Sequence, residues 1–156
     1  AVARAWTRKF LGYSFWVAKG RVIRPRVAPA ALAEMKARVR LITSRTGGRS
    51  MTTVAAELRS YLTGWKLYFQ LAETPNVFHE LDKWLHRRLR AVQLKQWKRG
   101  TTVYPELRAR DVPACVARAA AAHARRWWAT AAHGALHTAL PTSYFDRLGV
   151  PRLAAR

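Results

Sequence analysis

The chain has 156 residues, and 29 Lys and Arg against 8 Asp and Glu give it a formal net charge of +21. Half of its residues are hydrophobic, which excludes a mainly disordered chain, because disorder combines high charge with low hydrophobicity. The single cysteine, Cys115, excludes a disulfide scaffold and a zinc finger, and we expect it to be a small core residue. The sequence has no run of 18 uncharged apolar residues, so we expect no transmembrane helix.

The positive charge indicates a polyanionic partner, because so many like charges on a small chain repel one another. Nucleic acid is the first candidate and an anionic membrane surface is the rival. Arg supplies 22 of the cations and Lys only 7, and the planar Arg side chain suits phosphates and bases. A GC-rich genome would also favour Arg over Lys, but it would not produce the net charge. The N-terminal residues lack the apolar core of a signal peptide, so we expect a cytoplasmic protein without a membrane partner.

The first predicted element is a β-hairpin. Residues 10–17 are rich in aromatic and β-favouring types, residues 18–20 read as a turn, and residues 21–24 can return as the second strand. Two strands alone are marginally stable in water, so this hairpin should pack against another part of the chain.

Two amphipathic helices are predicted next. From Ala30 onward, apolar residues recur at three- and four-residue spacing, and Pro29 suits the first turn. A polar loop follows, after which Ser50 or Thr52 can cap a second helix that Pro75 would end. Gly64 lies inside the second helix, and close packing against a neighbour would compensate its cost of about 1 kcal/mol. The residues expected in the core of this and the next helix are Leu58, Leu62, Trp65, Phe69, Leu85 and Leu89.

A third helix is predicted next. Thr74 or Asn76 can cap its start, and Gly100 is expected to end it. The remaining third of the chain is Ala-rich and broken by prolines, which indicates further short helices. The predicted fold is therefore mainly α, a helical bundle preceded by a short β-hairpin and followed by Ala-rich helices.

No catalytic or metal site is predicted. Glu80 and Asp82 are the only acidic residues close in sequence, and positions i and i+2 of a helix point apart, so no polymerase carboxylate cluster is expected. His133 and His137 have a spacing that can bind a metal, but no third ligand is evident. We therefore expect no cofactor.

The strongest pattern is the basic stretch from residue 82 to residue 99. On a helix, Arg87, Arg90 and Lys98 can line one side, and Arg88 and Lys95 another. Such a surface suits structured RNA, which proteins read through shape, phosphates and the 2′-hydroxyl. The alternative is a solvated basic face, with Trp84 and Trp97 packed inward rather than stacked on bases.

These residues resemble a known family. The segment Leu62-Thr63-Gly64-Trp65-Lys66-Leu67-Tyr68-Phe69 and the later Arg87-Arg88-Leu89-Arg90 and Gln96-Trp97-Lys98 resemble the maturase-specific domain of group II intron-encoded reverse transcriptases. Phe10-Leu11-Gly12-Tyr13-Ser14-Phe15 resembles the last conserved segment of their reverse transcriptase palm. One departure is Asp111, where the family has a familiar Gly.

The resemblance implies a C-terminal part of such a protein. It implies that residues 1–28 are the end of the palm with the hairpin, residues 29–104 the thumb or maturase-specific domain, and residues 105–156 a post-thumb helical segment. The family's polymerase carboxylates precede this region and its optional HNH endonuclease needs cysteine pairs, so we expect no enzyme. The implied function is binding of group II intron RNA to assist its splicing.

Further partners that the resemblance suggests are target DNA and a separate upstream reverse transcriptase fragment. Two alternatives stay open: a non-functional remnant of a mobile element, and a general basic helical protein that binds DNA or RNA. The residues expected to bind RNA are Arg38, Arg40, Arg45, Arg49, Lys66, Lys83, Arg87, Arg88, Arg90, Lys95, Lys98 and Arg99. Replacing Arg87 and Arg90 together by Ala is expected to weaken RNA binding and leave helicity intact.

Overall fold

A computed structural model describes residues 11–44 and 48–154 of the chain. The N-terminal element is a hairpin of β1 (Tyr13–Val17) and β2 (Ile23–Val27), which pair antiparallel from Tyr13 opposite Val27 to Val17 opposite Ile23. The helices that follow are α1 (Pro29–Ile42), α2 (Met51–Tyr68), α3 (Pro75–Trp97), α4 (Gly100–Arg108), α5 (Ala114–Ala122), α6 (Trp127–Thr130), α7 (Gly134–Ala139) and α8 (Thr142–Arg147). This architecture confirms the predicted mainly α fold with a preceding hairpin.

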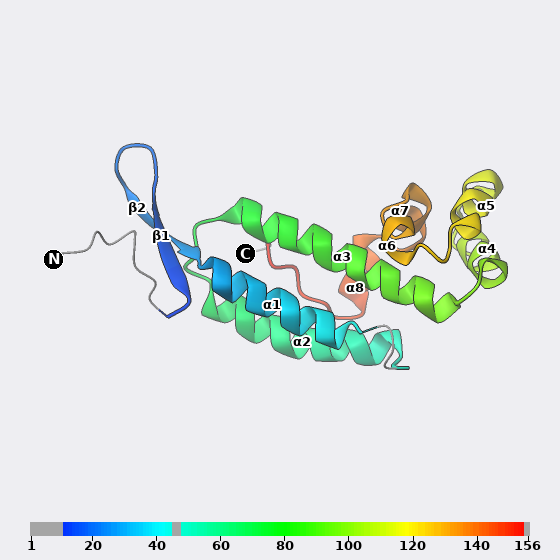
Figure 1. Cartoon of the computed structure of the whole chain (residues 1–156), viewed down its shortest axis with the longest axis horizontal. Coiled ribbons are helices and arrows are strands. Elements are labelled where there is room, and N and C mark those ends of the chain that lie inside the picture. The colour runs from blue at the N-terminus through cyan, green and yellow to red at the C-terminus, as the bar shows by residue number, and fades with distance from the viewer. Residues whose placement is uncertain (1–10, 45–47, 155–156) are drawn as a thin grey trace.

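The three long helices α1, α2 and α3 lie side by side and form the body of the molecule (Figure 1). The hairpin lies at one end of this body; α6 and α7 lie beside the second half of α3, and α4 and α5 lie at the other end. The C-terminal segment after α8 runs back along the long helices. The core follows the apolar stripes read from the sequence: the six expected core residues are all buried, at 9% exposure or less.

The hairpin packs on the end of α2, as its marginal stability requires. The Tyr68 hydroxyl donates to the Leu11 carbonyl at 2.8 Å, and the Tyr13 ring lies 5.1 Å from the Phe69 ring between centroids. The second strand is also tied to the turn after α2, because the Glu73 amide donates to the Pro25 carbonyl at 2.8 Å. The aromatic end of α2 is therefore what holds the hairpin.

Helix boundaries differ from the expectations in two places. Pro75 begins α3 rather than ending α2, because the chain already leaves the helix after Tyr68. Gly100 does not end α3: that helix stops at Trp97, Lys98 adopts a positive φ of 64°, and Gly100 begins α4. The N-cap of α2 agrees with the expectation: it is Ser50, whose hydroxyl accepts from the Thr53 amide at 3.1 Å.

Gly64 and Cys115 contradict the packing expected of them. A Cβ added at Gly64 would meet nothing within 4 Å, so no close helix contact explains this glycine. The close approach occurs instead at Gly100, where a Cβ would lie 2.6 Å from the Ala121 carbonyl oxygen. Cys115 is exposed on α5 rather than buried in the core, because the buried positions of that short helix are Ala117 and Ala120.

Candidate nucleic-acid interface

The basic stretch of α3 does not form one continuous surface, because its arginines leave the helix in different directions. Arg90 points into the protein: it is only 5% exposed, its Nε donates to the Leu140 carbonyl at 3.0 Å, and burial lowers the pKa of its guanidinium. The expectation that Arg90 lines an RNA-facing side with Arg87 and Lys98 is therefore wrong. The reason is that α8 and the segment before it cover this side of α3, which the sequence pattern of one helix does not reveal.

Arg87 and Lys95 hold α6 on α3. The Arg87 Nε and Nη2 both donate to the Trp128 carbonyl, at 3.0 and 2.8 Å, and its guanidinium lies 4.2 Å from the centroid of a Trp128 ring. Lys95 lies similarly over Trp127, at 4.1 Å. Replacing both Arg87 and Arg90 by Ala would therefore remove two tertiary contacts, so this double variant is not the clean test of RNA binding that the sequence suggested.

Arg49 and Lys66 also donate to main-chain carbonyls. The Arg49 guanidinium donates to the Ile42 carbonyl at 2.6 Å and pairs with Glu57, so it joins the end of α1 to α2. The Lys66 ammonium donates to the Arg152 carbonyl at 2.8 Å and so holds the C-terminal segment. Both contacts give these two cations a structural role.

Four of the other predicted RNA-binding residues are exposed but dispersed. Arg38 lies on α1 on the side of Tyr61, Lys83 pairs with Glu80 at 2.7 Å, and Lys98 and Arg99 lie in the turn between α3 and α4. Arg45 falls outside the described residues. Trp97 is buried with the Arg110 guanidinium 5.1 Å from its ring centroid, so it packs inward.

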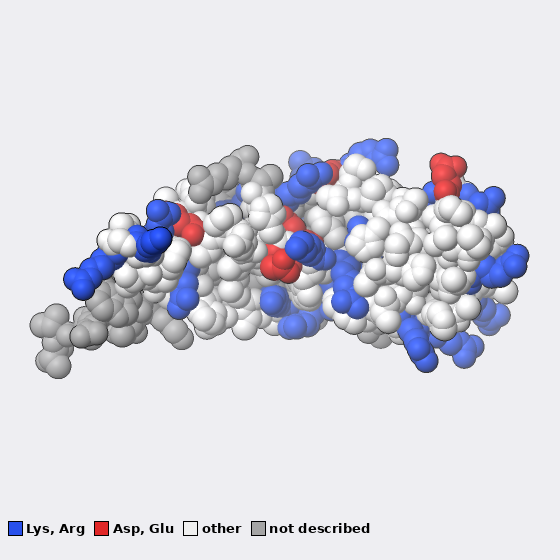
Figure 2. Space-filling model, turned by 90° about the horizontal axis from the view of Figure 1, so that it is seen from above, with Lys and Arg blue, Asp and Glu red and all other residues white. Residues whose placement is uncertain are grey.

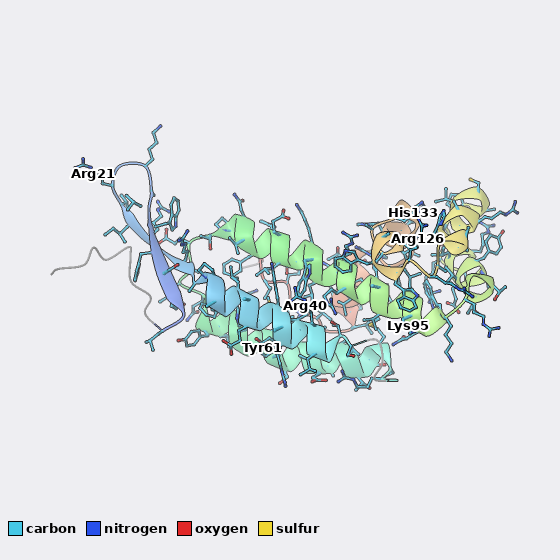
Figure 3. All side chains as sticks on the ribbon, viewed as in Figure 1. Arg21, Arg40, Tyr61, Lys95, Arg126 and His133 are labelled. Atoms are coloured by element: carbon cyan, nitrogen blue, oxygen red, sulfur yellow. The ribbon has the colours of Figure 1, made fainter. Side chains whose placement is uncertain are left out.

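Arg40 and Arg88, the remaining two predicted residues, meet at a pocket between α1, α3 and α6. The pocket has a volume of about 240 Å³, and we call it the Trp84 pocket. Its lining residues are Arg40, Thr43, Trp84, Arg88, Ala91, Val92 and Trp128. In Figure 3 the Arg40 side chain lies between α1 and α3, and Lys95 lies further along α3.

Three cations converge on the ring of Trp84. Lys36 Nζ, the Arg40 guanidinium and the Arg88 guanidinium lie 5.9, 5.7 and 5.5 Å from its centroid. Lys36 and Arg40 are one turn apart on α1 and therefore share the face toward α3, whereas Arg38 points away from it. None of the five salt bridges among residues 11–44 and 48–154 involves Lys36 or Arg40. The pocket therefore concentrates positive charge beside an aromatic ring.

Arg88 is oriented by a buried hydroxyl. Thr43 is fully buried at the end of α1; its Oγ1 donates to the Val39 carbonyl at 2.6 Å and accepts from the Arg88 Nε at 2.8 Å. This contact joins α1 to α3 and directs the guanidinium to the pocket wall.

Lys36, Thr43 and Trp128 are not among the residues predicted from the sequence to bind RNA. The one-turn spacing of Lys36 and Arg40 could have indicated Lys36, since both lie off the apolar stripe of their helix. Nothing local could have indicated Trp128, because it reaches the pocket from a separate helix 40 residues beyond Arg88.

The wider surface is basic and sparsely acidic. Figure 2 shows Lys and Arg side chains from the hairpin end to the α4 and α5 end of this face, with Asp and Glu in a few places between them. Within the described residues, no group of three or more His, Cys, Asp and Glu could hold a metal ion. The described helices include none with the length and apolar character needed to cross a membrane.

Comparison with known families gives one match. Residues 32–110, about half of the chain, match the family described as group II intron, maturase-specific domain. The chain belongs to this family. No curated protein matches the chain. The matched range of the maturase-specific domain contains the lining residues of the pocket from Arg40 to Val92, whereas Trp128 lies beyond it.

Proposed function

We propose that this maturase-specific domain binds group II intron RNA and assists its splicing by stabilising the folded intron. The observation that carries the proposal is the family match, which connects residues 32–110 with group II introns. A net charge of +21 supports it, because cations that neutralise phosphates release counterions from RNA. Tighter binding to the folded intron than to its unfolded forms would shift the folding equilibrium toward the splicing-active form.

We also propose that the chain contributes no catalytic group and that the RNA performs the chemistry. The described carboxylates support this proposal because most of them are engaged singly in structural contacts. Glu57, Glu73, Glu80, Glu106 and Asp146 each pair with a Lys or Arg. Asp82 accepts from the Leu153 and Ala154 amides, each at 2.9 Å. Target DNA and a separate reverse transcriptase part stay predictions as further partners, as does the cytoplasmic location.

The test is binding of the chain to a folded group II intron RNA across a salt series, with an unrelated structured RNA of equal length and a duplex DNA as controls. Preference for the intron that persists as salt rises supports the proposal, because non-specific phosphate contacts weaken steeply with salt. Equal binding to all three, lost together as salt rises, would contradict it and favour a general basic nucleic-acid-binding protein. Splicing of the intron at low Mg²⁺, with and without the chain, measures the assistance itself.

A further inference from the structure

We propose that the Trp84 pocket binds a single unpaired nucleotide of RNA, its phosphate beside Lys36 and Arg40 and its base against the indole of Trp128. The inference rests on the proposed RNA-binding function and names the place and chemistry of one contact. The charge, the lining residues and the size of the pocket support this contact.

The positive charge of the pocket favours an anionic ligand. Arg40 and Arg88 both line the pocket, and Lys36 lies one turn before Arg40 on α1, so three cations lie within 6 Å of the centroid of the Trp84 ring. A phosphate placed beside them would be attracted to these positive charges, and guanidinium groups bind phosphate oxygens in a bidentate geometry. The Arg88 Nε donates to the Thr43 hydroxyl at 2.8 Å, so the Arg88 guanidinium is preorganised before any ligand binds.

The walls of the pocket suit a base as well as a phosphate. A site for phosphate alone needs only donors, whereas this one has two indoles, Trp84 and Trp128, and apolar side chains from Ala91 and Val92. Trp128 is 40% exposed, although Arg87 already stacks on its ring and binds its carbonyl. Exposed aromatic rings held in this way are the platforms on which proteins stack unpaired bases.

The size of the pocket favours an unpaired nucleotide over a duplex. A volume of about 240 Å³ cannot admit a helix, whose bases are stacked and paired inside. A base that is displaced from its helix, in a bulge or a loop, can enter. Exposed cations elsewhere on the surface, such as Arg38, would contact other phosphates of the RNA without reading the base.

The experiment compares two RNA hairpins that are identical except for one unpaired bulged nucleotide, titrated with the full chain at physiological salt. A third hairpin carries an abasic site at the bulge. We expect the bulged hairpin to bind about tenfold more tightly than the paired one, as one stacked base would give. The abasic hairpin should lose most of this preference, because it keeps the flexible backbone but lacks the base.

Two pairs of variants locate the contact. Trp128→Ala should abolish the preference for the bulge and leave affinity for the paired hairpin within about twofold, whereas Trp16→Ala, at an exposed tryptophan of the distant hairpin, should change neither. Arg40→Gln should reduce the preference, whereas Arg38→Gln, an equal charge loss two residues away, should weaken both hairpins alike. Circular dichroism checks that each variant is folded. If Trp128→Ala does not fold, the comparison of Arg40→Gln with Arg38→Gln tests the pocket instead.

Several outcomes would overturn the inference while leaving RNA binding intact: equal affinity for bulged and paired hairpins, a preference retained in the abasic hairpin, or a preference retained in Arg40→Gln. A nucleoside monophosphate that competes as strongly as the bulged hairpin would assign the pocket to free nucleotides instead. Failure to bind any of the hairpins or the intron would instead contradict the proposed function. The two failures are therefore distinguishable.

Discussion

At the scale of single residues, two glycines show how position in the fold decides the effect of one side chain. Gly64 lies on the exposed side of α2 and an added Cβ meets nothing, whereas Gly100 faces the Ala121 carbonyl at the start of α4. The same substitution should therefore have opposite effects at these two sites.

We predict that Gly64→Ala raises the free energy of unfolding by about 1 kcal/mol, since Ala is favoured over Gly within a helix. Gly100→Ala should lower it by about 1–3 kcal/mol, because an overpacked Cβ must displace backbone atoms. Urea denaturation of both variants measures the difference. A loss of stability at Gly64 would show that a neighbour approaches there after all.

His86 makes the stability of the protein depend on pH. It is buried beside Phe145, with a distance of 5.6 Å between ring centroids, and burial lowers the pKa of its imidazole despite the nearby carboxylates of Asp82 and Asp146. The positive charge of Arg90 acts in the same direction as burial. The unfolded chain, in which the pKa is ordinary, therefore takes up a proton first as the pH falls.

We predict that the free energy of unfolding is highest above about pH 6.5, the ordinary pKa of histidine. It should fall as the solution is acidified below that value. His86→Gln, which cannot titrate, should show a smaller fall than the wild type between pH 7.5 and 5.5 in urea titrations. Burial also lowers the pKa of His137, so His137 should cause part of the fall that remains in His86→Gln. An equal fall in both proteins would remove His86 as the cause.

At the scale of elements, both α2 and α3 bind the C-terminal segment that follows α8. Asp82 of α3 accepts from two successive amides of this segment, Lys66 of α2 binds the Arg152 carbonyl, and Leu153 is buried. These contacts fix the segment along the long helices, which is the path that it follows in Figure 1. Asp82 thus has a tertiary role, besides its place early in α3.

We predict that Asp82→Asn lowers the free energy of unfolding by about 1–2 kcal/mol, because two amides then compete for one weaker, uncharged acceptor. Glu80→Gln is the matched control: it loses the same charge two residues away, but its pair with Lys83 is exposed and contributes about 0–1 kcal/mol at most. Chemical denaturation compares the two. Equal losses would mean that only charge near the start of α3 matters.

At the scale of the whole molecule, charge dominates. A net charge of +21 on 156 residues must oppose compaction, and the five described salt bridges offset little of it. The protein should therefore gain stability from anything that screens or neutralises its cations.

We predict that Tm rises as NaCl increases from low to physiological concentration, by about 2–4 °C for each kcal/mol of repulsion relieved. A tightly bound RNA should raise Tm further at fixed salt, because ligands that bind only the folded state stabilise it. Thermal unfolding followed by circular dichroism measures both effects. A flat or falling Tm with salt would show that repulsion is not a significant cost in this fold.

The helical class, the hairpin, the core stripe of the long helices and the family could all be predicted from the sequence, and the match at residues 32–110 confirmed the family. These features are local, because hydrophobic spacing and turn residues act over a few positions. Which cations reach the surface depends instead on tertiary packing. Arg90 and Arg88 are two residues apart in one basic stretch, yet one is buried against Leu140 and the other lines the Trp84 pocket. Their environments differ because α8 covers one side of α3 while α1 and α6 meet on another, and no pattern within a single helix records what packs against it.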